Sequence, residues 1–457
     1  MGAYYMFLFS IFLILFAVFF YLFLRDRKHQ FSPLWLMLST WMIGLGVPQL
    51  HLSRIEKDWY PAFWLLLIVS LCMFVIGFYV FDWIWRKNVT RPFMGADKSA
   101  GYSGVSSQQL KINSLRVIIY ALFFISLIAL AMFYTRAGNF PLLAPDTDVF
   151  RFVADEQVPG LINYTAQFAR LFIPLSFFLI FYVARPFMSS NPEPINRNAT
   201  KWDLILIILI GAISLTLFAS RTQIFFVDLW VMALYLLMRK PNLKQALKFY
   251  PIFLLISVLV LAAVPLYRQY KSYGTTDYLA GVTSIDSSGF NPIGKALLPI
   301  YVGVSFNQQA LLHVTEYYET NDLQRGKVSL DPFTNIFGKA IPTLNKYKSD
   351  FDLCAIFKCW WNTGTYLFPF VQDFGKAAFV FVPFLLAGIL AAVWRYWQSS
   401  PNFLSLNLYA YACFFIIMTI YLSFTVRAEM YLDLFLLLAI HLAVSKKVIP
   451  GYSTNIA

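Results

Sequence analysis

Long apolar runs separated by short polar segments constrain this chain more than any other feature of its sequence. A helix of about 20 apolar residues crosses the hydrocarbon core of a bilayer, so runs near this length predict transmembrane helices. Eleven such runs cover residues 3–24, 32–50, 61–83, 115–134, 160–184, 202–219, 223–238, 249–266, 374–393, 403–425 and 430–444. Only 13% of the residues are charged, compared with about 25% in soluble domains. The sequence therefore predicts an all-α polytopic membrane protein with about eleven transmembrane helices.

The placement of Lys and Arg predicts the orientation of these helices. If the joint with Arg25, Arg27 and Lys28 is cytoplasmic and the joints alternate from there, the cytoplasmic segments carry 19 of the 36 Lys and Arg residues but only 5 of the 23 Asp and Glu residues. This excess is the positive-inside pattern. It predicts an external N-terminus, with the first run retained, and a cytoplasmic C-terminus. It also accounts for the net charge of +13 without a basic face for nucleic acid.

One long segment, residues 267–372, interrupts the apolar pattern and faces outward in this topology. Its many Trp, Tyr, Phe and Pro residues argue against disorder, because disordered segments are poor in aromatics. We expect a folded external loop that covers a site at the membrane face. Within it, residues 295–318 mix apolar patches with Gln308, Gln309 and Glu316, which predicts an amphipathic helix lying at the interface.

The external segment also holds two of the four cysteines. Cys354 and Cys359 are five positions apart, and in an oxidising compartment this spacing can close a disulfide loop, although the backbone geometry decides. No His or further Cys stands nearby, which argues against a metal pair. Cys72 and Cys413 fall inside apolar runs and are expected to pack there.

These features divide the chain into four parts in sequence order. Residues 1–135 are expected to form an N-terminal membrane scaffold, and residues 136–266 a central membrane region with the first external loop and a hairpin at Arg221. Residues 267–373 form the large external loop, and residues 374–457 the C-terminal membrane helices.

Three arginines, Arg221, Arg268 and Arg427, stand at the external ends of different runs, and Arg136 and Arg151 lie on the same side. A guanidinium stays charged and binds phosphate through two parallel hydrogen bonds. Arginines at a lipid–water boundary therefore suit the diphosphate of a lipid-linked substrate. A structural role for each, such as snorkelling to headgroups, stays open.

Arg170 is a separate case, because it lies about ten residues into the run 160–184. A charge at this depth is costly and normally faces a wet or protein-lined interior. An internal ion pair, with Asp228 as a candidate partner, and a role in substrate binding are both open.

Motifs of other common chemistries are missing from the sequence. It has no P-loop, dinucleotide-binding fingerprint, zinc-protease motif or nucleophile elbow. Only four histidines occur, and His313 alone lies in the external segment, where a buried or interfacial role is favoured over catalysis. We therefore predict neither a metal site nor a cofactor.

Four short motifs follow one another between about residues 130 and 430. They are Gly138-Asn139-Phe140-Pro141-Leu142-Leu143, Ser220-Arg221-Thr222, Tyr267-Arg268-x-Tyr270, and Asn362-Thr363-x-Thr365 leading to Asp373-Phe374-Gly375. Together they resemble motifs of the bacterial oligosaccharide repeat-unit polymerases, the Wzy-type or O-antigen polymerases. An Arg-x10-Gly pattern of some members does not recur here.

The resemblance implies a membrane glycosyltransferase with a GT-C-like fold that acts on the periplasmic face of the bacterial inner membrane. It implies transfer of a glycan from undecaprenyl diphosphate to the next lipid-linked repeat unit, with inversion and without metal or nucleotide sugar. The product would be the O-antigen of lipopolysaccharide or a related surface polysaccharide. The implied partners are the lipid-linked oligosaccharide and the bilayer, with a chain-length regulator and a flippase of the pathway as further candidates.

The same resemblance assigns site residues. It puts Arg221, Arg268 and Arg427 at the diphosphate and sugar, and the base for the acceptor hydroxyl would be Asp373 or Glu429. The residues expected to bind substrate are Arg136, Arg151, Arg170, Tyr270, Asn362 and Thr363.

Three other functions compete with the polymerase. O-antigen ligases commonly have His-Asn before the returning span, whereas Trp361 precedes Asn362 here, which favours a polymerase. A flippase or transporter would be expected to show repeated halves and midplane polar groups, and few central charges occur beyond Arg170 and Asp228. A structural envelope protein without catalysis is also compatible with the sequence.

Overall fold

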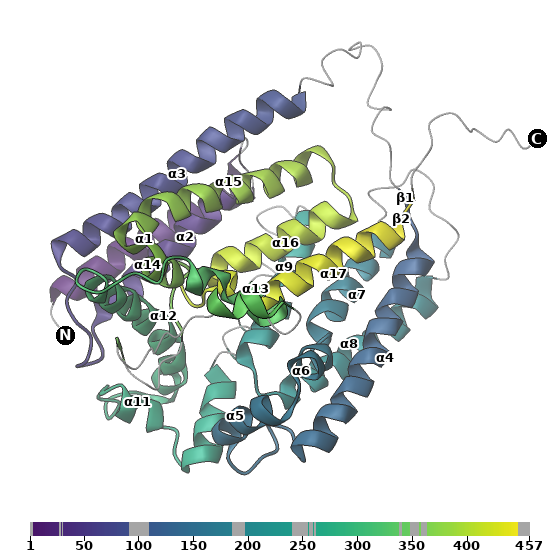
Figure 1. Cartoon of the computed structure of the whole chain (residues 1–457), viewed down its shortest axis with the longest axis horizontal. Helices are drawn as coiled ribbons and strands as arrows, with labels where there is room; N and C mark the ends of the chain where they lie inside the picture. The colour runs from purple at the N-terminus through teal and green to yellow at the C-terminus, as the bar shows by residue number, and fades with distance from the viewer. Residues whose placement is uncertain are drawn as a thin grey trace, which may run out of the picture. The chain divides into compact units, whose positions relative to one another are not determined.

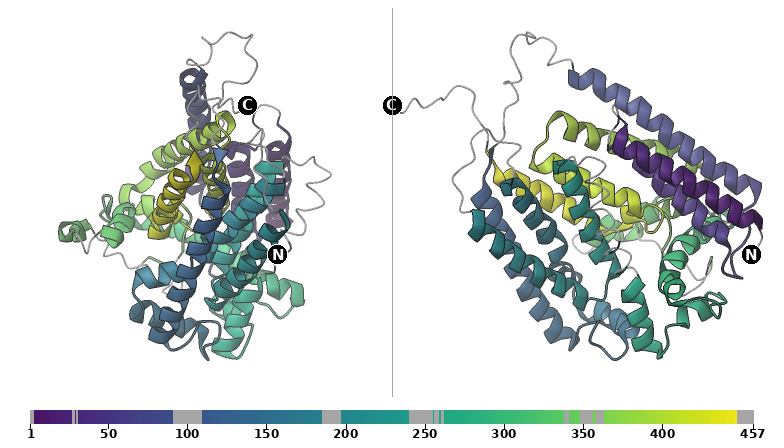
Figure 2. Two further views of the ribbon diagram at one scale, coloured as in Figure 1. Left: turned by 90° about the vertical axis from the view of Figure 1, so that its right-hand side faces the viewer. Right: turned by 180° about the vertical axis from the view of Figure 1, so that it is seen from behind.

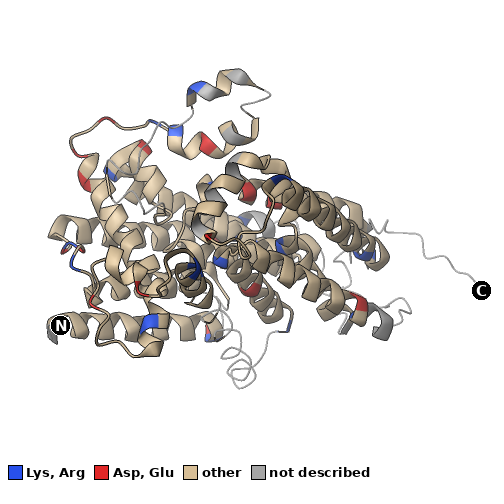
Figure 3. Ribbon diagram, turned by 90° about the horizontal axis from the view of Figure 1, so that it is seen from below, with Lys and Arg blue, Asp and Glu red and all other residues tan. Residues whose placement is uncertain are grey.

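The computed structural model is helical almost throughout the part of the chain that it describes. The described residues are 3–26, 29, 31–90, 109–184, 197–239, 255, 259, 262–337, 341–347, 356–357 and 363–446. Six helices among them are long and apolar enough to cross a membrane: Tyr4–Arg25, Pro61–Lys87, Ile112–Ala137, Gly160–Val183, Arg221–Arg239 and Phe368–Ser399. Lys, Arg, Asp and Glu are sparse along the helices (Figure 3). The prediction of an all-α, multi-pass membrane protein is confirmed at this level, while the number of eleven spans and the GT-C likeness stay predictions.

The chain forms two compact units that interleave in sequence. Unit 1 comprises Met1–Ile84, Leu261–Trp394 and Ala412–Leu432, and unit 2 comprises Trp85–Val260, Arg395–Tyr411 and Asp433–Ala457. The four-part division in sequence order stays a prediction.

Unit 1 contains the N-terminal helices and spans the whole external segment, residues 267–372. Its elements are α1 (Ala3–Arg25), α2 (Pro33–Gly46), η1 (Val47–Leu50), most of α3 (Pro61–Thr90), α11 (Tyr278–Val282), α12 (Pro292–Tyr317), α13 (Lys327–Phe337), η2 (Pro342–Tyr347), α14 (Phe368–Phe374), η4 (Gly375–Ala377), most of α15 (Ala378–Ser399), the second part of α16 (Phe403–Met418) and η5 (Phe424–Val426). Residues 262–273 are also helical. Pro33 begins α2, where its missing N–H costs nothing.

The helices α3 and α15 of unit 1 lie side by side (Figure 1 and Figure 2). They pack through a reciprocal exchange of small and large residues. Gly77 of α3 faces Phe384 of α15, and one turn further along both helices Gly388 faces Phe81. Because both residue numbers increase together, the two helices run parallel. Small residues at such contacts let helices in a bilayer approach closely.

The helix α12 is the buried centre of unit 1. It packs against α2, η1 and α14, and sixteen of its residues are buried, among them Asn307, Gln308 and Gln309. The expectation of an amphipathic helix lying at the interface is therefore wrong for this segment, because its polar residues face protein instead of water. Of these, Asn307 donates to the carbonyl of Tyr421, and Gln309 exchanges two hydrogen bonds with the backbone of Lys57.

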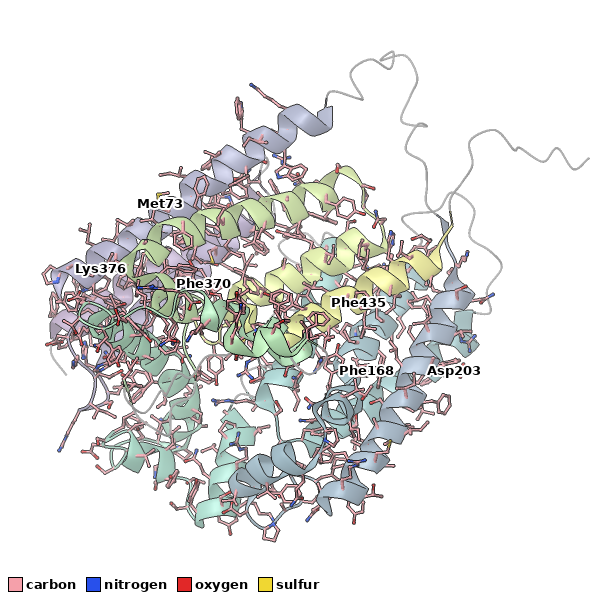
Figure 4. All side chains as sticks on the ribbon, viewed as in Figure 1. Met73, Phe168, Asp203, Phe370, Lys376 and Phe435 are labelled. Atoms are coloured by element: carbon pink, nitrogen blue, oxygen red, sulfur yellow. The ribbon has the colours of Figure 1, made fainter. Side chains whose placement is uncertain are left out.

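Unit 2 is built from α4 (Ile112–Ala137), α5 (Thr147–Gln157), α6 (Gly160–Ala166), α7 (Ala169–Ala184), α8 (Arg197–Leu217) and α9 (Arg221–Arg239), with parts of α16 and of α17 (Ala428–Val444). The predicted run 160–184 is divided between α6 and α7, with Phe168 at the break (Figure 4). The carbonyl of Ala166 at this break accepts a hydrogen bond from Ser126 Oγ of α4, at 3.0 Å, which satisfies a group that the helix leaves unpaired.

Opposite ends of unit 2 are marked by two backbone contacts. At one end the two-residue strands β1 (Gln109–Leu110) and β2 (Ser445–Lys446) pair antiparallel, so the start of α4 lies beside the end of α17. At the other end the N–H of Leu142, beyond α4, donates to the carbonyl of Leu217 at the end of α8, at 2.9 Å.

Candidate functional site

Of the stretches that the sequence singled out, Gly138–Leu143 contacts the end of α8 through Leu142 and Leu217, three residues before Ser220–Thr222. Besides that hydrogen bond, the ring of Phe133 contacts Phe140 and Phe218, with centroids 6.1 and 5.0 Å away. Gly138 ends α4 in the left-handed conformation, with φ of 75°, which a glycine adopts without strain. The chain can therefore turn sharply back against the end of α8.

Arg221 is the first residue of α9 and follows a joint of three residues after α8. The carbonyl of Ser220 accepts hydrogen bonds from the N–H groups of Gln223 and Ile224, so the helix begins directly at the arginine. A helix N-terminus carries partial positive charge, which adds to the guanidinium. Arg221 is half-buried.

Arg136 and Arg151 belong to the same end of unit 2. Arg136 lies in the last turn of α4 and is exposed, and Arg151 lies on α5, which packs against α4. The predicted arginines of unit 2 are thus gathered at one end, except for Arg170.

Arg170 forms a buried cluster with Asp433 of α17 and Tyr164 of α6. Its Nη2 lies 3.1 Å and its Nε 3.3 Å from Asp433 Oδ1, which also accepts a hydrogen bond from the Tyr164 hydroxyl at 3.0 Å. The guanidinium carbon lies 4.5 Å from the centre of the Tyr164 ring. Arg170 and Asp433 are only 1% and 2% exposed. An internal ion pair of Arg170 is therefore present, with a partner that the sequence did not suggest.

Arg268 and Tyr270 lie in the helical residues 262–273 of unit 1. Arg268 is half-buried and Tyr270 is 63% exposed. Between them the buried Gln269 accepts a hydrogen bond from the N–H of Leu279, at 2.9 Å. This bond links the helix to α11.

Asp373 lies at the end of α14 and is 1% exposed. Its Oδ1 accepts the N–H of Val328 at 3.1 Å, and its Oδ2 accepts the N–H and the hydroxyl of Ser329 at 2.7 and 2.5 Å. The carboxylate thus caps the N-terminus of α13. Both carboxylate oxygens accept hydrogen bonds from α13, which favours a structural role over proton transfer.

Arg427 and Glu429 stand between η5 and the first turn of α17. Arg427 is exposed and Glu429 is half-buried. The helix α13 packs against η5, and Phe333 of α13 contacts Tyr431 with ring centroids 4.8 Å apart. Asp373, Arg427 and Glu429 therefore belong to one neighbourhood of unit 1.

Thr363 donates a hydrogen bond to Asn307 Oδ1 in the centre of α12, at 2.8 Å. The side-chain amide of Asn307 donates in turn to the carbonyl of Tyr421, so this part of the Asn-Thr motif links α12 to the segment before η5. Asn362, Cys354 and Cys359 lie outside the described residues.

A half-buried carboxyl that the sequence did not single out lies in unit 1. Glu56, in the joint before α3, accepts hydrogen bonds from Ser305, from Tyr301 at 2.6 and 2.9 Å, and from the N–H of Ser53 at 3.1 Å. Burial raises the pKa of Glu56, while the hydrogen bonds from Ser305 and Tyr301 act in the opposite direction. Its position in a short polar joint gives no sequence signal of this burial.

In the described part of the chain, no three His, Cys, Asp or Glu residues gather as a candidate metal site. Comparison with protein-family models, curated proteins and solved structures gives no significant match.

Proposed function

We propose that this protein is a glycosyltransferase of the bacterial inner membrane that polymerises undecaprenyl-diphosphate-linked repeat units on the periplasmic face. The observation that carries the proposal is the meeting of Gly138–Leu143 with the Arg221 hairpin, joined by the Leu142–Leu217 hydrogen bond. Two motifs about 80 residues apart in the sequence contribute Arg221 and Arg136 to one end of unit 2. Guanidinium groups at the end of membrane helices suit a diphosphate on a lipid.

The proposed orientation is supported within each unit. The predicted topology gives α3 and α15 the same direction across the membrane, in agreement with their parallel packing. It also puts the start of α4 and the end of α17 on the cytoplasmic side, in agreement with the pairing of β1 with β2. The segments after α4 and α8, which touch through Leu142 and Leu217, would both be periplasmic.

In the proposed reaction, a hydroxyl oxygen of the acceptor repeat unit attacks the anomeric carbon of the donor glycan, and the bond to undecaprenyl diphosphate breaks. The resemblance assigns Arg221, Arg268 and Arg427 to the diphosphate, where a guanidinium would offset the charge that develops on the leaving group, and such fixed electrostatic stabilisation is often the largest catalytic contribution. The half-buried Glu429 receives the proton of the acceptor hydroxyl. The arginines and Glu429 thus account for the leaving-group charge and for the proton, and the proposed step includes neither a metal nor a nucleotide sugar.

Lysine substitution of the three arginines tests this assignment. Lys keeps the charge but loses the planar fork, so Arg221→Lys, Arg268→Lys and Arg427→Lys should each lower polymerisation in isolated membranes by about tenfold to a hundredfold. Arg54→Lys, an exposed arginine of the first external joint, is the matched control and should keep wild-type activity. Wild-type rates in all three variants would refute the arginine site.

A further inference from the structure

The start of α13 has no local side chain to cap it. The residue before the helix is Gly326, with φ of 93°, and Arg325 also has a positive φ of 54°. Helices usually begin after Ser, Thr, Asp or Asn, whose oxygen accepts the first free N–H groups. A glycine cannot supply this acceptor. Asp373, about 45 residues later, supplies it through the N–H groups of Val328 and Ser329.

Further hydrogen bonds at Asp373 join α13 to α14. The Ser329 hydroxyl adds a third hydrogen bond at 2.5 Å. The N–H of Gln324, just before α13, donates to the carbonyl of Gln372 in α14, at 2.9 Å. The backbones of the two segments are therefore also linked. With the carboxylate 1% exposed, these bonds are shielded from competing water. Charge-assisted hydrogen bonds of this kind are stronger than neutral ones.

A series of contacts connects α13 to the turn before Arg427. The helix packs against η5, the three-residue turn that ends just before this arginine. The ring of Phe333 contacts Tyr431, and the Tyr431 hydroxyl donates to the carbonyl of Thr425 within η5, at 2.9 Å. The turn before Arg427 is therefore held from one side by α13 and from the other by α17.

We infer that Asp373 is a positioning residue which, by capping α13, holds the η5 turn and thereby sets the place of Arg427. The inference rests on the proposed function, in which Arg427 binds the diphosphate, and it removes Asp373 from the candidates for the base. A base must offer an oxygen to the substrate hydroxyl. Both oxygens of Asp373 accept hydrogen bonds from α13, so proton transfer would require that the cap be dismantled.

Hydrogen exchange on the purified full-length protein tests the structural part without reference to activity. Asp373→Ala removes the cap, and loss of such a cap typically raises local opening about fivefold. We expect faster exchange in peptides that cover residues 327–337 and 424–430. Asp373→Asn keeps an oxygen acceptor and should restore much of the protection. Asp322→Asn changes an exposed carboxylate of the same segment and should leave both peptides unchanged.

The effect on the reaction separates a positioning residue from a base. We expect Asp373→Asn to keep at least about a third of wild-type kcat/KM with an unchanged pH profile, and Asp373→Ala to lose more than tenfold. Combined with Arg427→Lys, Asp373→Ala should cost little more than Arg427→Lys alone, because coupled residues are not additive. If Asp373→Asn is as inactive as Asp373→Ala while exchange stays at the wild-type rate, Asp373 is a base and the inference is wrong.

If Asp373→Ala does not fold, Ser329→Ala is the alternative variant for the hydrogen-exchange test. It removes only the hydroxyl donor and leaves both N–H groups on the carboxylate, so a smaller rise in exchange over the same two peptides is expected. No change at residues 424–430 in any variant would contradict the link from α13 to Arg427. If the wild type has no transferase activity, the proposed function fails, and the exchange data still decide whether Asp373 holds the turn.

Discussion

Arg170 and Asp433 carry opposite charges at a place in unit 2 where both side chains are almost fully buried. Removal of one member leaves the other without its counter-charge, which typically costs about 3–5 kcal/mol. We therefore expect Asp433→Asn to lower the free energy of unfolding by about that amount. The measurement is denaturant or thermal unfolding of the purified protein in detergent.

The exposed pair Arg116–Asp203 of unit 2 provides the control for this prediction. Solvated ion pairs contribute roughly 0–1 kcal/mol, so Asp203→Asn should change stability little. The double variant with Arg170→Met and Asp433→Leu should recover much of the loss, because no unpaired charge stays buried. Equal effects of Asp433→Asn and Asp203→Asn would contradict the buried cluster.

Glu56 predicts a dependence of stability on pH. Because burial raises its pKa in the folded protein, the folded state binds the proton more tightly than the unfolded state does. The stabilising contribution is present below the ordinary glutamate pKa of about 4.3 and is lost as the pH rises through the raised value. His51 opposes this shift with its charge.

Unfolding temperatures of wild type and Glu56→Gln between about pH 4 and pH 8 check this sign, since the window must span the ordinary pKa of about 4.3. The glutamine keeps an oxygen acceptor but does not titrate. We expect wild type to lose stability relative to Glu56→Gln as the pH rises. A difference that is constant with pH, or one of opposite sign, would rule out a raised pKa.

At the residue scale, the sequence could predict that Arg170 needs a partner but could not identify it. A charge within an apolar run signals an internal contact, and Asp433 carries the same signal in another run. Which two charges meet depends on helix packing, which a single sequence does not reveal. Asp373 illustrates a second limit, because a cap supplied from 45 residues away has no local pattern.

At the element scale, the parallel packing of α3 and α15 makes a direct prediction for Gly77. A Cβ at this position would lie 2.6 Å from the carbonyl oxygen of Phe384, and backbone cannot move aside as a side chain can. We expect Gly77→Ala to destabilise the protein by about 1–3 kcal/mol, the usual cost of overpacking. Unfolding of the purified variant measures this loss.

Gly160 of α6 is the matched control, because a Cβ there would meet nothing within 4 Å. Gly160→Ala should be neutral or slightly stabilising, since alanine favours helix by up to about 1 kcal/mol. If both variants unfold like wild type, the close approach of α3 and α15 is incorrect.

Periodicity and hydropathy predicted helices well where the runs are long and apolar, as in α3 and α4. They failed in α12, since buried polar residues with partners in the protein look the same in sequence as residues facing water. The run 160–184 matches a candidate membrane span, Gly160–Val183, but its break between α6 and α7 was not predicted. The carbonyl at that break depends on Ser126 of another helix, which the local pattern cannot show.

At the scale of the whole molecule, the topology predicts which surfaces face the periplasm. Thr320→Cys, in the external segment, and Gln398→Cys, near the end of α15, are both exposed positions. In a background without the four native cysteines, a membrane-impermeant maleimide should label Thr320→Cys in intact spheroplasts. It should label Gln398→Cys only after lysis. The reverse pattern would invert the proposed orientation.

The division into two interleaved units could not be predicted from the sequence, because α16 and α17 each contribute to both. The order of motifs likewise did not reveal which of them come together. Gly138–Leu143 and the Arg221 hairpin lie in unit 2, whereas Arg268, Asp373 and Arg427 lie in unit 1.

Transfer between lipid-linked glycans is tested with the purified protein and a defined undecaprenyl-diphosphate repeat unit. The reaction contains no nucleotide sugar and no added metal, and the products are separated by size. We predict a ladder of glycans that lengthen by one repeat unit at a time and that Arg221→Lys greatly weakens. A folded protein that leaves the repeat unit unchanged would contradict the account. Transfer only to an added lipid A core would identify a ligase instead.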